Sequence, residues 1–417
     1  MSRTVYVIGA GLSGLSAAVT LAGRGERVVM FEGAAQAGGR CRSYHDPQLD
    51  AVIDNGNHLV LSGNRAVNAY LERIGAQDRL TGPDTAAIAF ADLKRGARWT
   101  IRPNRGRLPW WIFARNRRVP GTTPGDYLSL AALLHPPRGR RLDQVTACKG
   151  RLWELLLQPF LLAVLNTEPE AGSADLAAAV VRETLALGSD ACRPRIAHPT
   201  LASAFVDPAL AYLESHGAEV HLGKRVRSLD LANGRVASFA LPGRDVTLEP
   251  DDRLILAVPP WAAQDLLPGL SAPGEFRAIV NGHFLIPAPA GAEPMVGLIG
   301  GTAEWVFAFP DRISVTVSGA DRLLDDDREA LARRLWADVA ALHHLPAELP
   351  PWQIVKERRA TFAATPEQDA KRPGARTQWD NLLLAGDWTA TGLPATIEGA
   401  LRSGRTAADW VARAQGV

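Results

Sequence analysis

The chain has few cysteines, three among its 417 residues, at Cys41, Cys148 and Cys192. The number is odd and the spacing matches no metal-ligand motif, so the sequence predicts neither a disulfide framework nor a metal site. We therefore expect the protein to work in a reducing compartment.

A strong charge of either sign is also lacking. Lysine and arginine number 46 and aspartate and glutamate number 44, which leaves a net charge of +2. This balance gives no reason to expect a nucleic-acid partner, and the sequence contains no nucleic-acid-binding motif.

Long hydrophobic runs are missing as well. The most apolar stretch, residues 152–165, is interrupted by Glu154, Gln158 and Pro159 and is too short to span a bilayer. The N-terminus lacks the charged leader and apolar core of a secretory signal. These features predict a cytoplasmic protein.

What the sequence does contain, near its N-terminus, is the pattern of a dinucleotide-binding turn. Residues 4–8 are a short β-branched run, typical of a buried parallel strand, and three glycines and a helical stretch follow. Gly9 allows the tight turn, Gly11 lets a pyrophosphate approach the backbone, and Gly14 lets the helix pack on the strand. The start of the helix offers free N–H groups to the phosphates. The expected contacts are Gly9, Ala10, Gly11, Leu12, Ser13 and Gly14.

A second strand, residues 27–31, ends in Glu32. An acidic residue at this position suits a ribose diol, and the absence of a nearby basic residue in the sequence disfavours a 2′-phosphate. The strand, the helix and Glu32 together predict dinucleotide binding, which the glycines alone would indicate only weakly.

Two further segments resemble the glutathione-reductase-type FAD enzymes, in their amine oxidase and phytoene desaturase branch. The first is Ala37-Gly-Gly-Arg40 and the second is Asp54-Asn-Gly-Asn-His58. The resemblance implies that Gly38, Gly39 and Arg40 lie against the diphosphate and flavin. It also implies that the second segment runs along the isoalloxazine ring, with contacts from Asn55, Gly56, Asn57 and His58.

The C-terminal segment has the pattern of a strand and helix that return to the same site. A strand ends at Gly386-Asp387, and a final helix opens at Thr396 and Ile397. In the enzymes that the chain resembles, the aspartate holds ribityl or pyrophosphate oxygens and the helix start faces the flavin, where its positive dipole end stabilises an anionic reduced ring. The same resemblance places a strand around Val226 against the adenine.

The sequence therefore predicts an α/β fold with two domains. One is a glutathione-reductase-type Rossmann FAD-binding domain, made of residues 1–80, 198–275 and 372–417. The other is a discontinuous α+β substrate-binding domain, made of residues 81–197 and 276–371. We expect the FAD to be bound non-covalently, because the C-terminal block contains no cysteine.

Several segments between these motifs resemble the bacterial hydroxysqualene dehydroxylases, the squalene-associated FAD enzymes of hopanoid synthesis, over essentially the full length. The segments are Asp54 to Asn64, Leu165-Asn-Thr167 with Pro169, Ala257 to Trp261, Lys356 to Pro366, Ala385 to Thr389 and Gly392 to Gly399.

Two departures from the amine oxidases favour this branch. Amine oxidases form one wall of an aromatic cage from the segment before the final helix, which here is Pro394-Ala-Thr396. They also hold a lysine near flavin N5, where the comparable strand, residues 277–286, offers Asn281 and His283. A cationic amine substrate is therefore disfavoured.

The resemblance implies reduction of hydroxysqualene, an allylic alcohol, to squalene with hydride from the reduced flavin. Hydroxide is a poor leaving group, so a proton must reach the oxygen as the C–O bond breaks, and an allylic cation needs a dry pocket. The candidate acids are His58, His283 and Asp387, with His58 first because its unperturbed pKa is near neutral.

A C30 hydrocarbon substrate is expected at a membrane. Residues 105–118 interleave Trp110, Trp111 and Phe113 with arginines, a pattern suited to the headgroup region of an anionic leaflet. We therefore expect the protein to be peripheral at the inner face of the membrane. The alternative is that these aromatic side chains pack into the core of the substrate domain.

Three other functions remain open. One is a desaturase that acts on squalene or a carotenoid precursor in the oxidative direction, and the second is an amine oxidase. The third is a non-catalytic carrier of prenyl chains, which would not need the full set of flavin contacts. The sequence identifies no electron donor, because it has no second dinucleotide motif.

Overall fold

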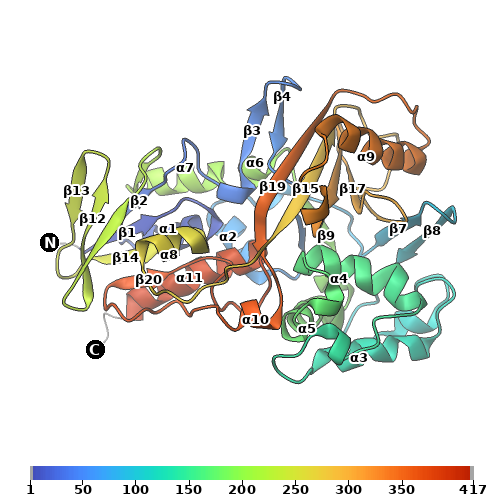
Figure 1. The fold of residues 1–417 in the computed structure, drawn as a ribbon, viewed down its shortest axis with the longest axis horizontal. Helices are drawn as coiled ribbons and strands as arrows, with labels where there is room; N and C mark the ends of the chain where they lie inside the picture. Colours follow the sequence, from blue (N-terminus) through green and yellow to red (C-terminus); the bar gives the residue numbers. More distant parts are fainter. Residues whose placement is uncertain (1–2, 414–417) are drawn as a thin grey trace.

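The computed structural model describes residues 3–413. Within them, a five-stranded parallel sheet forms the core of the nucleotide domain (Figure 1), with strand order β10-β2-β1-β14-β20. Its strands are mostly buried apolar runs, as expected for a parallel sheet covered on both faces. The strands are β1 (Thr4–Ile8), β2 (Arg27–Phe31), β10 (Glu219–His221), β14 (Arg253–Leu256) and β20 (Leu382–Leu384). Three distant parts of the chain therefore build one sheet, and the predicted α/β class is confirmed.

Helices cover one face of this sheet. Helices α1 and α11 lie so close together that a Cβ at Gly404 would overlap the backbone of Ser13, and the Ser16 hydroxyl donates to the Leu401 carbonyl over 2.8 Å. The helices on this face are α1 (Leu12–Ala22), α2 (Arg65–Arg73), α6 (Leu201–Phe205), α7 (Asp207–Ser215) and α11 (Ile397–Arg413), whereas α8 (Pro260–Leu266) packs in the apolar cluster of the opposite face.

A small antiparallel sheet covers the other face. It consists of β11 (Ser228–Ala232), β12 (Arg235–Leu241) and β13 (Arg244–Thr247). Phe239 of β12 contacts Tyr6 and Phe31 edge to face, at ring-centroid distances of 5.4 and 5.5 Å. The β11–β12 turn has positive φ at Asn233 and Gly234, which confirms the hairpin that the Asn-Gly pair predicts.

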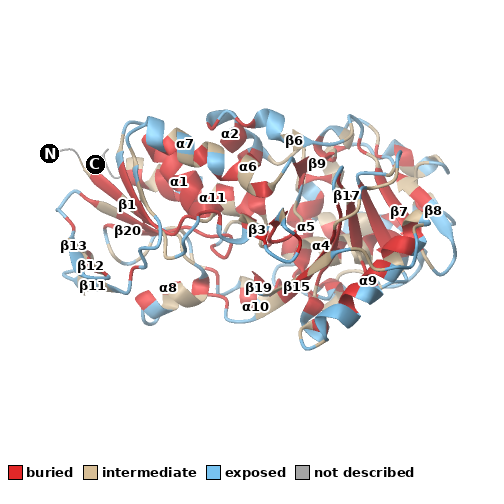
Figure 2. Ribbon diagram, turned by 90° about the horizontal axis from the view of Figure 1, so that it is seen from above, coloured by how far each residue is buried: buried red, intermediate tan, exposed pale blue. Residues whose placement is uncertain are grey.

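A seven-stranded mixed sheet dominates the substrate domain of the described chain. Its order is β19-β15-β18-β17-β16-β7-β8, and helix α9 (Arg328–His343) covers one face, where Trp336 packs against Phe284. Most strands of this sheet are buried (Figure 2). They are β7 (Ile88–Asp92), β8 (Ala97–Ile101), β15 (Phe276–Phe284), β16 (Met295–Ile299), β17 (Trp305–Ala308), β18 (Ile313–Val317) and β19 (Trp352–Phe362).

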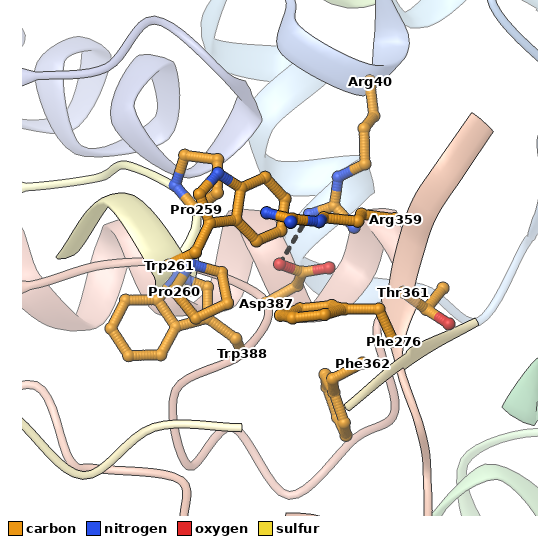
Figure 3. Close-up of a pocket in the computed structure, with 10 residues that line it drawn as sticks. All are labelled: Arg40, Pro259, Pro260, Trp261, Phe276, Arg359, Thr361, Phe362, Asp387 and Trp388. Atoms are coloured by element: carbon orange, nitrogen blue, oxygen red, sulfur yellow. Dashed lines mark hydrogen bonds and ion pairs between the residues drawn. The ribbon is translucent and has the colours of Figure 1, made fainter. Parts of the chain in front are cut away.

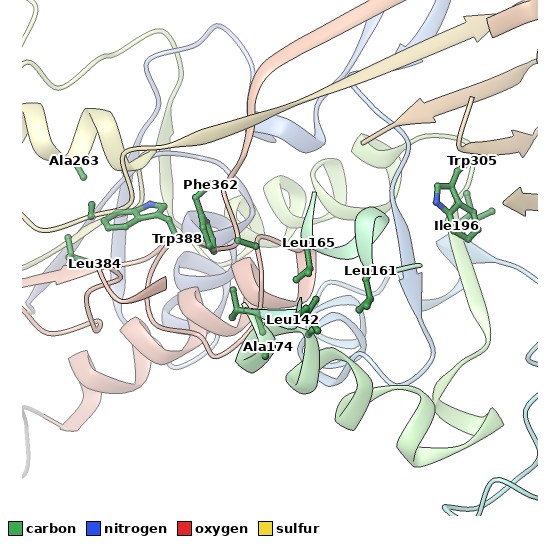
Figure 4. Close-up of a cluster of buried hydrophobic side chains, with 14 of the residues drawn as sticks. Leu142, Leu161, Leu165, Ala174, Ile196, Ala263, Trp305, Phe362, Leu384 and Trp388 are labelled. Atoms are coloured by element: carbon green, nitrogen blue, oxygen red, sulfur yellow. The ribbon is translucent and has the colours of Figure 1, made fainter. Parts of the chain in front are cut away.

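Helical and short elements complete the fold. A π-helical stretch (Trp153–Leu157) leads into α4 (Gln158–Leu165), and Leu161 and Leu165 of α4 belong to a buried apolar cluster with Trp305 and Ile196 (Figure 4). In the chain from 3 to 413, no helix is both long and apolar enough to cross a membrane. The other helices and strands are α3 (Leu128–Leu134), α5 (Ala174–Glu183), α10 (Pro366–Asp369), β3 (Ser43–Asp46), β4 (Ala51–Asp54), β5 (Leu59–Leu61), β6 (Leu80–Thr81) and β9 (Pro194–Ala197). Short 3₁₀ segments lie at Gly39–Cys41, Gln77–Arg79, Trp110–Phe113, Pro124–Tyr127, Leu142–Gln144, Pro169–Ala171, Leu185–Leu187, Ser189–Ala191 and Ala320–Leu323.

Candidate functional site

The turn between β1 and α1 requires glycine at two positions. Gly9 has φ +105°, and a Cβ there would lie 2.5 Å from the carbonyl oxygen of the residue that follows β14. A Cβ at Gly14 would overlap the Gly9 carbonyl, so α1 packs tightly on the strand. At Gly11 a Cβ would meet no described atom within 4 Å. This open space, where Leu12 and Ser13 begin α1, fits a diphosphate.

Glu32 lies at the carboxyl end of β2. Its carboxylate accepts hydrogen bonds from the backbone amides of Ala10, at 2.7 Å, and of Ala34, at 2.8 Å. These bonds hold the carboxylate beside the glycine turn, where the sequence predicts the ribose.

The segment around Val226 lies along Glu32, but it is not the strand that we expected. Residues 224–227 have no regular structure, and the Lys224 amide donates to the Glu32 carbonyl at 2.7 Å. Arg225 packs over Gly33. The absence of a basic residue near Glu32 in the sequence does not extend to the folded chain, because the fold brings Lys224 and Arg225 to this segment from a distant part of the sequence.

Arg40 and Asp387 join the two ends of the chain. Gly38 and Gly39 both have positive φ, 101° and 56°, and turn the backbone so that Arg40 reaches Asp387 at 2.6 Å and the Ala360 carbonyl at 2.5 Å. Burial disfavours the charged guanidinium, but the Asp387 carboxylate outweighs it and raises the pKa of Arg40. The Asp387 carboxylate is engaged in the ion pair and holds the Arg40 side chain in place. This engagement does not favour Asp387 as the proton donor.

A network of amides connects the second predicted flavin segment to β15. Asn57 donates to the Thr316 hydroxyl at 3.1 Å, and Thr316 donates to Asn281 at 2.8 Å. The Asn281 side chain also donates to the Asn55 carbonyl at 3.5 Å, and a Cβ at Gly56 would lie 2.9 Å from it. The sequence places Asn281 in the right strand but gives no partner for it, because all its partners are distant along the chain.

His58 is half-buried beside Arg40. Burial, with the nearby Arg40 charge, lowers the pKa of His58 to about 4, although a hydrogen bond to the Arg40 backbone acts in the opposite direction. Its imidazole is therefore neutral near pH 7. The reason for ranking it first, a near-neutral pKa, is wrong for the folded protein.

His283 is completely buried in β15, with its Nδ1 2.9 Å from the Ser314 hydroxyl. Burial, together with the charge of Arg312, lowers the pKa of His283 to about 4. A neutral imidazole that is completely buried is not available to donate a proton to a substrate. The structure therefore argues against His283 as a general acid and makes it a packing residue of the sheet.

The final helix begins as the sequence predicts. Thr396 caps it, since its hydroxyl accepts from the Gly399 amide at 3.1 Å, and Ile397 is the first helical residue. Gly386 lies at the end of β20, where its amide donates to the Ser403 hydroxyl at 2.9 Å. The second turn of α11 and the residues that follow β20 therefore lie side by side.

Glu398, in the first turn of α11, was not among the residues expected at the site. It is 3% exposed, and its carboxylate accepts from the amides of Ala66, at 2.9 Å, and Val67, at 3.0 Å, at the start of α2. Arg402 also bonds to it, at 3.2 Å. An acidic residue in the first turn of the final helix was the available signal in the sequence, and the structure shows that it ties α2 to α11.

A pocket opens beside the Arg40–Asp387 pair (Figure 3), with aromatic and proline side chains around it. Trp261 and Phe276 meet edge to face at 5.0 Å. The Arg359 guanidinium lies 4.8 Å above the Trp261 ring and 5.7 Å from the Phe276 ring. The Arg359 guanidinium thus covers the Trp261 and Phe276 rings at the edge of this pocket.

Residues 105–118 divide between surface and core. Trp110 and Phe113 are 64% and 61% exposed, whereas Trp111 is 5% exposed and packs against Tyr127. Including Trp111 among the membrane-facing aromatics was therefore wrong, since it anchors the segment to the core.

Comparisons with known proteins agree with this architecture. Residues 12–412 match the family of flavin-containing amine oxidoreductases. A protein named hydroxysqualene dehydroxylase from Rhodopseudomonas palustris is 54% identical, with 99% of each chain covered. One of the same name from Sinorhizobium fredii is 51% identical, with 98% of each covered.

Solved structures show the same fold at low identity. Putrescine oxidase bound to putrescine is 19% identical with a TM-score of 0.70, covering 99% of this chain and 100% of that one. Cyclohexylamine oxidase from Brevibacterium oxydans is 15% identical with a TM-score of 0.71, covering 100% of both. From the full-length family match and the two near-identical-length relatives, it follows that this chain is an FAD-dependent oxidoreductase of the hydroxysqualene dehydroxylase type, within the flavin-containing amine oxidoreductase family.

Proposed function

We propose that the protein reduces hydroxysqualene to squalene with loss of water. The observation that carries this proposal is the similarity, over 99% of the chain, to a protein with that name.

In this reaction a C–O bond breaks, a C–H bond forms, and the hydroxyl leaves as water after it receives a proton. Bound FAD in its reduced form would supply the hydride and lose two electrons. Arg40 and Asp387 would hold the diphosphate and ribityl side, and Asn57, through Thr316 and Asn281, would fix the segment beside the ring.

Of the three candidate acids, His58 is the one with partial exposure. Its lowered pKa makes it a neutral hydrogen-bond donor near pH 7, so we propose that it orients the leaving oxygen or a water. Substituting Ala for His58 should leave FAD bound and slow turnover by ~10²-fold, because the leaving oxygen loses a positioned hydrogen-bond donor.

The test of the reaction is anaerobic. The purified holoenzyme is photoreduced, hydroxysqualene is added, and the flavin spectrum and the extracted lipid are followed. Return of the oxidised bands with formation of squalene is the expected result. A flavin that stays reduced, together with reduction of the oxidised enzyme by squalene or phytoene, would favour the desaturase instead.

We also propose that the protein collects its substrate at an anionic membrane, through an apolar patch formed by Leu108, Trp110, Phe113 and Leu128. Exposure in this patch ranges from 61% for Phe113 to 71% for Leu128. Seven large hydrophobic side chains are exposed in the described chain, and these are four of them.

The charge around the apolar patch fits an anionic surface. Residues 105–118 contain five arginines and no acidic residue. Leu128 of the patch is the first residue of α3, which lies at the opposite end of the molecule from β12 and β13 (Figure 1). Aromatic and apolar side chains rimmed by cations are suited to insertion at the headgroup boundary.

A further inference from the structure

Six neighbouring strands of the seven-stranded sheet each contribute one residue to a line across it, which we call the transverse row. Directly paired residues project from the same face of a sheet, so the six side-chain positions lie on one face, opposite α9. The pairs are Asn281 with Thr316, Thr316 with Trp305, Trp305 with Gly297, Gly297 with Phe90, and Phe90 with Trp99.

One half of the transverse row is aromatic. Phe90 stacks on Trp99 with a centroid distance of 5.6 Å and meets Trp305 at an angle of 62° and 5.7 Å. A Cβ at Gly297 would lie 2.7 Å from the Phe90 ring and 3.2 Å from the Trp305 ring. The glycine therefore lets the two rings cover the sheet without a gap.

The other half is polar and faces the predicted flavin segment. Thr316 bonds to Asn281 and to Asn57, and the resemblance to the FAD enzymes implies that Asn57 lies beside the isoalloxazine ring. Trp305 is the cross-strand partner of Thr316. The indole therefore stands where the aromatic half meets the polar half, one strand away from the residues that hold the flavin segment.

The Trp305 side chain has an unused hydrogen-bond donor. Trp305 is 7% exposed, and no described atom accepts from its Nε1. A buried donor without a partner is costly, and buried N–H groups are normally satisfied. An acceptor that arrives with a ligand would satisfy this one.

We propose that the aromatic half of the transverse row binds the hydrocarbon chain of the substrate and that the Trp305 indole N–H donates a hydrogen bond to its hydroxyl oxygen. This inference rests on the proposed function. Hydroxysqualene carries one hydroxyl, whereas squalene has no oxygen. The same bond therefore places the reacting carbon toward the flavin segment and distinguishes substrate from product.

The test compares Trp305→Phe, which keeps an aromatic ring and removes the N–H, with Trp99→Phe as the matched control. Trp99 is also buried, with an Nε1 that lacks a described acceptor, but it lies at the far end of the transverse row. Equilibrium binding of hydroxysqualene and of squalene to the oxidised holoenzyme is measured in the same detergent. Flavin content and circular dichroism check that each variant is folded.

We expect the wild-type protein to prefer the alcohol, and Trp305→Phe to weaken alcohol binding about tenfold while squalene binding is unchanged. Trp99→Phe should keep the preference, because a change in the contact with the hydrocarbon chain affects the alcohol and squalene alike. A Trp305→Phe protein with the wild-type preference, or a wild-type protein that binds both lipids equally, would overturn the inference.

Turnover of hydroxysqualene by the reduced wild-type enzyme is measured as well, so that failure of this inference can be distinguished from failure of the proposed function. Normal turnover with an unchanged preference in Trp305→Phe removes Trp305 from the site and leaves the function standing. A preference lost only in Trp305→Phe, without turnover in the wild type, supports the alcohol site and rejects the reaction.

Discussion

The nucleotide end and the substrate-domain sheet position their functional residues by different means. At the nucleotide end, neighbours in sequence make the site: Gly9 and Gly14 lie in one turn, and a Cβ at Gly14 would overlap the Gly9 carbonyl. In the sheet, Asn281, Thr316 and Trp305 meet only because three strands pair in one register. Local motifs therefore reveal the first region, whereas only tertiary structure reveals the second.

The largest expected effect tests the nucleotide end. Gly14→Ala should cost about 3 kcal/mol or more of stability, since overpacking forces the backbone apart, and the protein should be purified with little FAD. Gly11→Ala is the control: it meets no described atom, so it should keep the stability and weaken FAD binding only. Thermal unfolding of the apoprotein and FAD titration measure the two effects. Equal stability losses in both variants would show that the turn is not set by the Gly14 contact.

The next effect concerns the outer surface of the substrate domain. The double variant Trp110→Ser and Phe113→Ser should bind anionic vesicles roughly tenfold more weakly, because two large side chains no longer enter the interface. Leu222→Ser, an exposed residue of the nucleotide domain at 37% exposure, is the control. Flotation with phosphatidylglycerol vesicles, at low and high salt, measures binding. Unaltered flotation of the double variant contradicts the membrane proposal.

A smaller effect is expected in the interior of the substrate-domain sheet, where buried His283 should make the stability of the protein depend on pH. The folded protein holds the pKa of His283 at about 4, below its usual value near 6.5, so the unfolded chain binds the proton more readily between these values. Stability is therefore fully present above pH 6.5 and is lost as the pH falls toward 4, by roughly 2 kcal/mol at pH 5 from this group.

Urea unfolding at pH 7 and pH 5 measures this dependence. His283→Gln, which removes the titrating group, should flatten the loss on the acid side, with His45→Gln as the control because His45 is exposed. An identical acid loss in wild type and His283→Gln would show that burial of His283 is not its source.

Site residues whose contacts are close in sequence could be predicted, whereas those whose partners are distant along the chain could not. The turn at Gly9, the carboxylate of Glu32 and the cap at Thr396 follow from local rules, and the structure places them as expected. The partners of Arg40 could not be predicted, because Asp387 and Ala360 lie more than 300 positions away in sequence.

The pKa values of the two candidate histidines could not be predicted from the sequence either. His58 and His283 were chosen by residue type and position, but their pKa values depend on burial and on the charges of Arg40 and Arg312. Desolvation is a property of the packed interior, so a sequence pattern does not contain it.

The sequence by itself determined the α/β class, the dinucleotide turn, the C-terminal return and the family. Each depends on glycine geometry, strand periodicity or an extended motif that the residues carry with them. The tertiary structure alone decided which aromatic side chains of residues 105–118 face solvent, which charges shift the histidines, and which residues share the transverse row. These features arise from burial and strand register, and both exist only after distant parts of the chain have packed together.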